Sequence, residues 1–248
     1  MNLKVRLVKL MSHSGFCSRR NAEKIIKDGE VRLNGNIFLG HTVEIKNISK
    51  LTIKGKQIKI EKPRVWCLNK GIGLICSNSN QYNKKNIFDV LPKNLPRLVS
   101  VGRLDLESQG LLLLTNNPTL SNFLEHPKNK IKRKYQVKVS GLITKKKIDT
   151  MERGVTIDEI NYQPMQIKLI NAEKNSLLEI TLQEGKNREI RKIMKNFDLK
   201  VIKLKRIEFG PFKLLNLNEN KITEVPLKVL KEKLKIIGFK YESDIWSS

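Results

Sequence analysis

The sequence predicts an α+β fold in which a small N-terminal module precedes a larger domain with a mixed, largely antiparallel central sheet and flanking helices. Strand-like runs of apolar and β-branched residues dominate after residue 63. Three helical patterns interrupt these runs without following every strand, which favours α+β over a regularly alternating parallel fold. The first sixty residues carry a separate pattern of two helices and short strands. A hydrophobic content of 39% is sufficient for a buried core.

Cap and turn residues define the elements of the N-terminal module. A helical repeat of apolar residues comes first and breaks at Ser14-Gly15. Ser18 is a typical N-cap for a helix that begins at Arg19, and Gly29 is a typical stop. Asn34-Gly35 is a typical hairpin turn. We therefore expect a first helix around Leu7, Val8 and Met11, a second helix at 19–28, a hairpin at 31–38, and strands at 42–45 and 57–60.

The larger domain begins after Lys62-Pro63, which we interpret as a linker because proline ends the preceding strand. The expected division is a module at 1–61, a domain at 62–240 and a C-terminal tail at 241–248. Strands are expected at 64–68, 97–101, 111–115, 131–139, 177–182 and 200–206. Helices are expected at 118–125, 144–153 and 187–196.

The charge of the chain predicts a polyanionic partner. The 49 Lys and Arg residues outnumber the 24 Asp and Glu residues, so the formal net charge is +25, of which +8 falls on residues 1–61. Nucleic acid suits this excess, because each neutralised phosphate releases a counterion. A membrane surface is the rival, but the sequence contains no long apolar run, amphipathic segment or lipidation signal that would support it. We expect a cytoplasmic, monomeric, RNA-binding protein.

Cysteine and histidine give no pattern for a metal site. The three cysteines, Cys17, Cys67 and Cys76, are odd in number and lack paired spacing, which fits a reducing compartment. The three histidines form no ligand pattern with them, so we assign no metal and no other cofactor.

The segment from Arg6 to Gly35 resembles the S4 RNA-binding domain. The match depends on the string from Ser18 to Ile26, followed by Gly29-Glu30-Val31-Arg32-Leu33-Asn34-Gly35. Asn21 departs from it, since the family commonly has Glu there, and this weakens a capping box rather than RNA binding. A basic face on an exposed helix is also compatible with simple solvation. The RNA contacts that the resemblance implies are Ser18, Arg19, Arg20, Lys24, Lys27 and Arg32.

Two segments of the larger domain place polar side chains beside predicted strands. In Gly102-Arg103-Leu104-Asp105, both Arg103 and Asp105 lie in a loop between two apolar strands, where a rigid scaffold presents reactive groups. Tyr135 lies on the strand at 131–139, among basic residues that suit a stacked base beside a phosphate track. Alternation places Tyr135 on the same face as Ile131, Arg133, Val137 and Val139. By spacing alone, a loop salt bridge and core packing explain these residues as well.

A third segment, 184–194, joins a strand end, a glycine turn and a basic helix start that contains Lys186, Arg188 and Arg191. Such a pattern is typical of a phosphate-binding loop. In this order the three segments resemble the bacterial ribosomal RNA pseudouridine synthases of the RsuA/RluB branch, over about residues 64–230. The departures are Asn69-Lys70-Gly71 in place of a common Lys-Pro turn, Glu189 in place of Gln, and Lys192 in place of Arg.

The resemblance implies an isomerase that converts uridine to pseudouridine without a cofactor. It implies that Asp105 is the essential carboxylate, as nucleophile or as base at the sugar, and that Arg191 pairs with it. It implies that Tyr135 stacks on the flipped uracil, and that Arg103 anchors the loop or a phosphate. The string 16–20 and Ile207-Glu208-Phe209-Gly210-Pro211-Phe212 favour the large-subunit enzymes over the small-subunit one. The alternatives are a small-subunit enzyme and a non-catalytic ribosome assembly factor, and an assembling ribosomal particle is a possible substrate.

Overall fold

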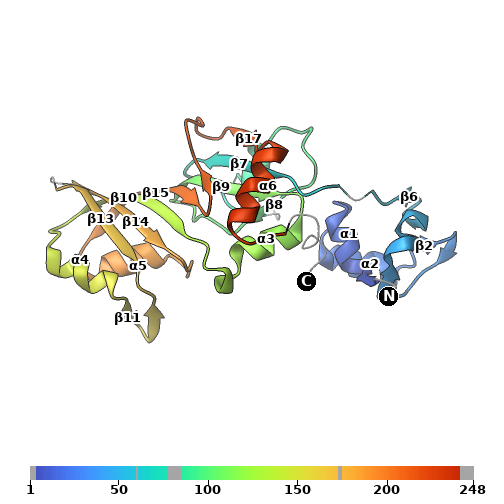
Figure 1. Cartoon of the computed structure of the whole chain (residues 1–248), viewed down its shortest axis with the longest axis horizontal. Coiled ribbons are helices and arrows are strands. Elements are labelled where there is room, and N and C mark those ends of the chain that lie inside the picture. Colours follow the sequence, from blue (N-terminus) through green and yellow to red (C-terminus); the bar gives the residue numbers. More distant parts are fainter. Residues whose placement is uncertain (1–3, 60, 78–84, 173–174, 241–248) are drawn as a thin grey trace.

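The structure is a computed structural model that describes residues 4–59, 61–77, 85–172 and 175–240. Figure 1 shows an elongated molecule with the N-terminal module at one end, a middle part around α3 and α6, and a far end that carries α4 and α5. None of the helices within these ranges is long and apolar enough to cross a membrane.

The N-terminal module contains two helices, α1 (Leu7–His13) and α2 (Arg19–Lys27), packed on short strands. Ser18 caps α2 as expected, because its hydroxyl accepts a hydrogen bond from the Asn21 amide at 3.2 Å. The strands are β1 (Lys4–Arg6) paired with β4 (Thr42–Glu44), and a sheet in the order β3 (Asn36–Ile37), β2 (Val31–Leu33), β5 (Leu51–Ile53), β6 (Lys56–Gln57). A 3-10 helix, η1 (Ile45–Lys50), joins β4 to β5. Residues of both helices, of η1 and of β1, β2, β4 and β5 share one core, which includes Leu7, Leu10, Met11, Ala22, Ile26, Val31, Leu51 and Ile53.

The larger domain is built on a sheet of nine strands among the described residues. The order is β13 (Gln166–Asn171), β14 (Asn175–Leu182), β10 (Arg133–Ser140), β15 (Lys200–Phe209), β9 (Gln109–Thr115), β7 (Val65–Lys70), β17 (Ile222–Glu224). In addition, β8 (Val99–Val101) pairs with β9, and β16 (Phe212–Lys213) pairs with β15. Among the described pairings between these strands only β9 and β15 run parallel, and an isolated parallel bridge joins Ile75 to Asn86. The prediction of a mixed, largely antiparallel sheet is therefore confirmed.

Helices cover both faces of this sheet. The helices are α3 (Pro118–Glu125), α4 (Lys145–Glu152), α5 (Glu189–Asn196) and α6 (Leu227–Ile236), with 3-10 turns η2 (Ile87–Val90) and η3 (Pro127–Asn129) and a hairpin of β11 (Val155–Ile157) and β12 (Ile160–Tyr162). Every residue of β9 is buried, which explains its uninterrupted apolar run. Leu111 and Leu113 face the core formed with α3 and α6, whereas Leu112 and Leu114 face the core formed with α5.

The structure adds elements to those predicted and shifts some limits. The helices at 118–125, 144–153 and 187–196 are present with limits shifted by at most two residues, as α3, α4 and α5. The strand expected at 97–101 is shorter and begins at Val99, three residues beyond Pro96, which has no amide to donate. The strand expected at 57–60 appears as Lys56–Gln57, and Ile60 lies outside the described residues, as does the predicted tail at 241–248. The elements that were not predicted are β1, β5, β11, β12, β13, β16, β17, α6 and the 3-10 helices η1, η2 and η3.

Polar contacts join the N-terminal module to the larger domain. The imidazole of His13, at the end of α1, is buried and lies 3.0 Å from the Thr119 hydroxyl and 3.5 Å from the Asn117 amide. Asn117 is also the N-cap of α3, where its side chain accepts a hydrogen bond from the Leu120 amide. Burial first, and then the charges of Lys9 and Arg19, lower the pKa of His13 to about 4. A neutral histidine therefore occupies the contact between the two parts.

Candidate active site

The loop that carries Asp105 connects β8 to β9 and is held by a buried lysine. Lys70, the last residue of β7, is completely buried, and its ammonium group donates to the carbonyl oxygens of Gly71 at 3.0 Å, Asp105 at 3.1 Å and Ser108 at 2.8 Å. Burial lowers the pKa of Lys70, although the nearby Cys76 and Asp105 oppose this shift. These bonds fix the loop backbone at Asp105 itself and three residues after it, and join both points to the end of β7.

Contacts from residues 73 and 76 also hold the same loop. The Cys76 thiol lies 3.3 Å from the Leu104 carbonyl oxygen and 3.4 Å from the Leu104 amide nitrogen. The Gly73 amide donates to the Leu106 carbonyl oxygen at 2.9 Å. Because Leu104 is itself buried in the core, the loop is anchored by a side chain as well as by hydrogen bonds. Asp105 is half-buried and therefore lies at the surface of a rigid support.

Tyr135 reaches the same region through strand pairing. In β10, Tyr135 is opposite Arg206 of β15, and Arg206 is in turn opposite Gly110 of β9, five residues after Asp105. Tyr135 and Leu104 belong to the same core cluster. The alternation predicted for this strand is confirmed, because Arg133, Tyr135, Val137 and Val139 are all buried. The parallel pairing of β9 and β15 thus brings Tyr135 to the side of the sheet on which the Asp105 loop is anchored.

Arg191 contacts the loop two residues after Asp105. Its guanidinium donates to the Glu107 carbonyl oxygen at 3.1 Å and lies 3.7 Å from the Glu107 carboxylate. Within the described residues, no ion pair closer than 4 Å joins Arg191 to Asp105, so the expected direct pair is replaced by a pair with Glu107. Burial lowers the pKa of Arg191, and both Glu107 and Asp105 oppose that shift, which places the Asp105 charge close enough to act on the guanidinium.

Glu107 is shared between two arginines of the 184–194 segment. Arg188 precedes α5 in a left-handed conformation, with φ of 52°, and its guanidinium lies 3.1 Å from the Glu107 carboxylate. The hydrogen bond from Arg188, followed by the charges of Arg188 and Arg191, lowers the pKa of the exposed Glu107 carboxyl. Arg191 pairs with Glu107 instead of Asp105 because the Glu107 carboxylate lies within reach of both Arg188 and Arg191.

Two interacting carboxyl groups, those of Glu184 and Glu189, lie at the N-terminal end of α5. Glu189, the first residue of α5, is buried and accepts a hydrogen bond from the Lys186 amide at 3.0 Å. Burial, together with the hydrogen bond and charge of Glu184, raises the pKa of Glu189 to about 8. Burial also acts to raise the pKa of Glu184, but hydrogen bonds from Lys186 and the Gln163 amide outweigh it and lower that pKa. Glu189 is therefore protonated at neutral pH and resembles the Gln that it replaces.

The remaining predicted residues differ in how far they are available for RNA. Arg103 is exposed and makes no hydrogen bond or ion pair with another described residue, so it is better placed for a phosphate than for anchoring the loop. Lys186 donates to the Asn161 carbonyl oxygen at 2.7 Å and pairs with Glu184, which commits it to the protein. Arg32 donates to the Gly35 carbonyl oxygen at 3.0 Å and closes its own hairpin. The basic residues of α2 that are exposed are Arg19, Arg20, Lys24 and Lys27.

Sequence reasoning missed several residues that position the site. Lys70 appeared only as a departure from a motif, and Arg206 was not singled out. Arg206 is almost fully buried, and its Nε donates to the Leu111 carbonyl oxygen at 2.7 Å. Glu107 was also missed, and its position two residues after Asp105 was the one sequence feature that could have pointed to it. In the described residues, His, Cys, Asp and Glu side chains do not gather in a group of three that could hold a metal ion.

Comparison with known families and structures identifies the domains. A family model described as RNA pseudouridylate synthase matches residues 64–196, and an S4 domain model matches residues 5–38. A crystal structure of a pseudouridylate synthase superposes with a TM-score of 0.67 over 92% of this chain and 99% of that chain, at 23% identity. This last likeness shows the fold.

Curated bacterial relatives match nearly the whole chain. An RNA pseudouridine synthase of Rickettsia bellii is 44% identical over 228 residues, which cover 91% of this chain and 99% of the relative. The ribosomal large subunit pseudouridine synthase B of Buchnera aphidicola is 39% identical over 83% of this chain and 86% of the relative. The protein of the same name from Bacillus subtilis is 34% identical over 89% and 91%, respectively. The chain belongs to the RNA pseudouridylate synthase family, whose members are isomerases that act on uridines of RNA, and it carries an S4 domain at its N-terminus.

Proposed function

We propose that this enzyme isomerises a specific uridine of large-subunit ribosomal RNA, with Asp105 as the essential carboxylate. The observation that carries the assignment of Asp105 is its loop, which Lys70 fixes through the Asp105 and Ser108 carbonyl oxygens. The choice of large-subunit RNA is supported by the names of the Buchnera and Bacillus relatives. The proposal includes domain limits of 1–61 and 62–240, a monomer, and a cytoplasmic location, where bacterial ribosomal RNA is processed.

The reaction breaks the bond between C1′ of the ribose and N1 of uracil, turns the base, and joins C1′ to C5. The proton on C5 is lost and N1 takes up a proton, so the product is an isomer of the substrate. An ionised carboxylate at position 105 acts on the sugar, as nucleophile at C1′ or as base for a ribose proton. Tyr135 provides an aromatic ring for the extruded uracil, and Arg103 provides a cation for the phosphate of the extruded nucleotide.

Primer extension after carbodiimide treatment tests the proposal directly. Ribosomal RNA from a strain that lacks the gene is incubated with the wild-type protein, Asp105→Asn or Asp158→Asn. Asp158 is an exposed residue of the β11–β12 turn, with φ of 48°, where asparagine is readily accommodated. We expect one new stop in large-subunit RNA with the wild-type protein and with Asp158→Asn, and none with Asp105→Asn. Identical stops for the two variants would overturn the assignment of Asp105, and a stop in small-subunit RNA would overturn the choice of substrate.

A further inference from the structure

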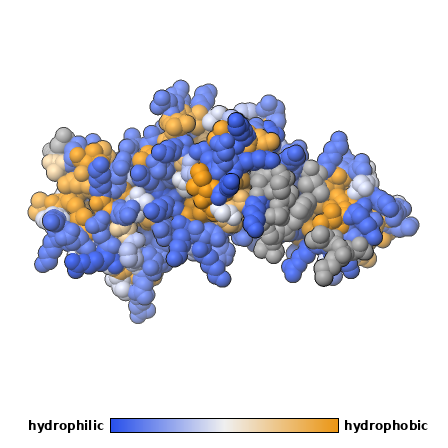
Figure 2. Space-filling view, in the orientation of Figure 1, coloured by the Kyte–Doolittle hydropathy of each residue, from blue (hydrophilic) through white to orange (hydrophobic). Residues whose placement is uncertain are grey.

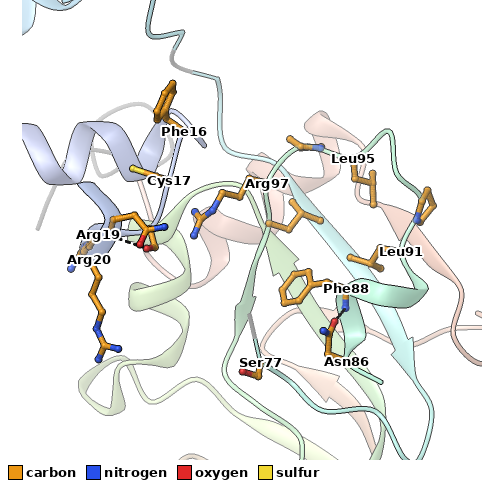
Figure 3. A pocket seen from close by; sticks show the side chains of 15 residues that line it. Phe16, Cys17, Arg19, Arg20, Ser77, Asn86, Phe88, Leu91, Leu95 and Arg97 are labelled. Atoms are coloured by element: carbon orange, nitrogen blue, oxygen red, sulfur yellow. Dashed lines mark hydrogen bonds between the residues drawn. The ribbon is translucent and has the colours of Figure 1, made fainter. Parts of the chain in front are cut away.

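A large cavity lies between the N-terminal module and the larger domain. Its volume is about 940 Å³, and its walls come from the start of α2, from η2 and the segment that follows it, and from residue 77. Figure 3 shows Phe16, Arg19 and Arg20 on one side and Phe88, Leu91 and Leu95 on the other, while Arg97 extends from the second side toward the first. The volume falls at the upper end of the range for ligand sites, about 300–1,000 Å³.

The charge of the walls selects an anionic occupant. Among the described residues that line the cavity, three are arginines and none is acidic. Arg19 and Arg20 are exposed at the start of α2, and Arg97 is half-exposed on the opposite wall. A guanidinium presents several donors in a fixed plane, which suits the oxygens of a phosphate. The two walls therefore place cations on both sides of the same space.

The remaining lining combines polar residues with apolar and aromatic ones. The polar residues are Ser18, Asn21, Ser77 and Asn86. The apolar and aromatic part suits a flat, partly apolar group attached to that anion. Phe88 and Leu91 are partly buried hydrophobic residues of the second wall, and Phe16 is partly buried in the first. Aromatic side chains bind unpaired bases of single-stranded RNA by stacking, largely without regard to base identity. A paired base would present only its edge, so the combination favours an unpaired nucleotide over a duplex.

The cavity and the Asp105 loop share a structural support. Cys76, whose thiol contacts the backbone of Leu104, immediately precedes Ser77 of the cavity wall. Arg97 lies in the segment that leads through β8 into the Asp105 loop. A single RNA strand bound at both places would therefore follow one continuous part of the protein.

We propose that this cavity is a second nucleotide site, which holds an unpaired nucleotide of the substrate RNA other than the target uridine. Its phosphate binds Arg97 together with Arg19 or Arg20, and its base packs against Phe88. The inference rests on the proposed action on RNA and adds a site separate from Asp105.

Binding of single-stranded RNA to the full-length protein tests the inference. The probe is a fluorescein-labelled oligouridylate of about eight nucleotides, within the usual range for single-strand sites. The variants are Phe88→Leu and Arg97→Gln, with Lys93→Gln as the matched control, because Lys93 is exposed in the same segment and does not line the cavity. Affinity is measured by fluorescence anisotropy at several salt concentrations.

We expect Phe88→Leu to weaken binding by about fivefold or more without changing the salt slope, since stacking is lost but no phosphate contact. We expect Arg97→Gln to weaken binding and to reduce the slope of log K against log salt by about 0.7, the contribution of one single-strand phosphate. Lys93→Gln retains the wild-type slope. If both cavity variants bind as the control does, the cavity is not an RNA site and the inference is wrong.

Photocrosslinking to the wild-type protein locates the bound RNA without depending on whether Phe88→Leu folds correctly. An oligouridylate that contains 4-thiouridine is irradiated with wild-type protein, and we expect crosslinks to residues 85–97. Crosslinks confined to the region of Tyr135 and Asp105 would contradict the inference. Neither measurement requires pseudouridine formation. The two proposals can therefore fail separately. If the wild-type protein modifies no RNA but the cavity variants still bind RNA more weakly, the proposed function is wrong and the second nucleotide site stands.

Discussion

The ammonium nitrogen of Lys70 lies 3.1 Å from the backbone carbonyl oxygen of Asp105, in a position that water does not reach. The lysine thus acts on the backbone that carries the carboxylate and leaves the carboxylate itself to the substrate. Since a buried ammonium is retained only where its donors are satisfied, its three carbonyl bonds explain both its burial and the fixed shape of the loop.

Replacement of Lys70 by methionine should weaken both the fold and the reaction. The buried carbonyl oxygens lose their common donor, so the free energy of unfolding should fall by about 1–3 kcal/mol. Without Lys70 the loop can shift, and displacement of the Asp105 carboxylate should lower kcat by about ten- to a hundredfold. Urea unfolding and single-turnover assays check the two effects, with Lys138→Met, at an exposed position of β10, as control. A normal kcat in a folded Lys70→Met protein would contradict the positioning role.

Glu189 should make the protein less stable as the pH rises. Its pKa in the folded state is about 8, above the ordinary value of 4.5. The unfolded chain therefore loses this proton first, and the free energy of unfolding falls between about pH 4.5 and 8 by at most about 1.4 kcal/mol per pH unit. Glu189→Gln should remove this dependence, whereas Glu23→Gln, on the exposed surface of α2, should retain it. Parallel slopes for Glu189→Gln and wild type in urea unfolding would exclude a buried, protonated Glu189.

His13 should have the opposite effect at lower pH. Its pKa of about 4 in the folded state lies below the ordinary value of 6.5. The unfolded chain then gains the proton first, so stability is complete above about pH 6.5 and falls by about 3 kcal/mol toward pH 4. An NMR titration of the His13 imidazole should give a midpoint near the lower value. A midpoint near 6.5 would show that His13 is not enclosed between α1 and α3.

Glu107→Gln should affect RNA binding more than stability. Exposed ion pairs contribute little to folding, so we expect little change in the free energy of unfolding. The substitution removes a negative charge that lies between Arg188 and Arg191, which should strengthen RNA binding at low salt. Anisotropy at two salt concentrations checks this expectation, with Glu159→Gln in the β11–β12 turn as control. Weaker binding would indicate that Glu107 orients the two arginines for RNA.

Salt dependence should report the phosphate contacts of α2. The slope of log K against log salt changes by about 0.7–0.9 per phosphate contact. Arg19→Ala combined with Arg20→Ala should therefore reduce the slope by up to twice that amount. The control, Lys145→Ala with Lys146→Ala, removes two exposed charges from α4, at the far end of the molecule from α2 (Figure 1). Equal slopes for the two double variants would mean that only the total charge matters.

Features that depend on the local spacing of residues were predictable from the sequence. The predicted cap residue Ser18 satisfies an amide three residues away, so the helix that follows it starts at a predictable position. The alternation around Tyr135 identified its buried face, because successive side chains of a strand point to opposite faces. Through its resemblance to a known family, the motif around Asp105 predicted a catalytic loop, and the family comparison confirmed the domain type.

Tertiary structure decided what lies around that loop. Lys70 reaches Asp105 across 35 residues of sequence, and Arg191 reaches Glu107 across 84. The pairing of Arg191 with Glu107, the raised pKa of Glu189 and the cavity between the two parts all depend on which surfaces meet and which water they exclude. Burial and charge act between residues that are close in space, so the spacing of residues along the chain does not predict these effects.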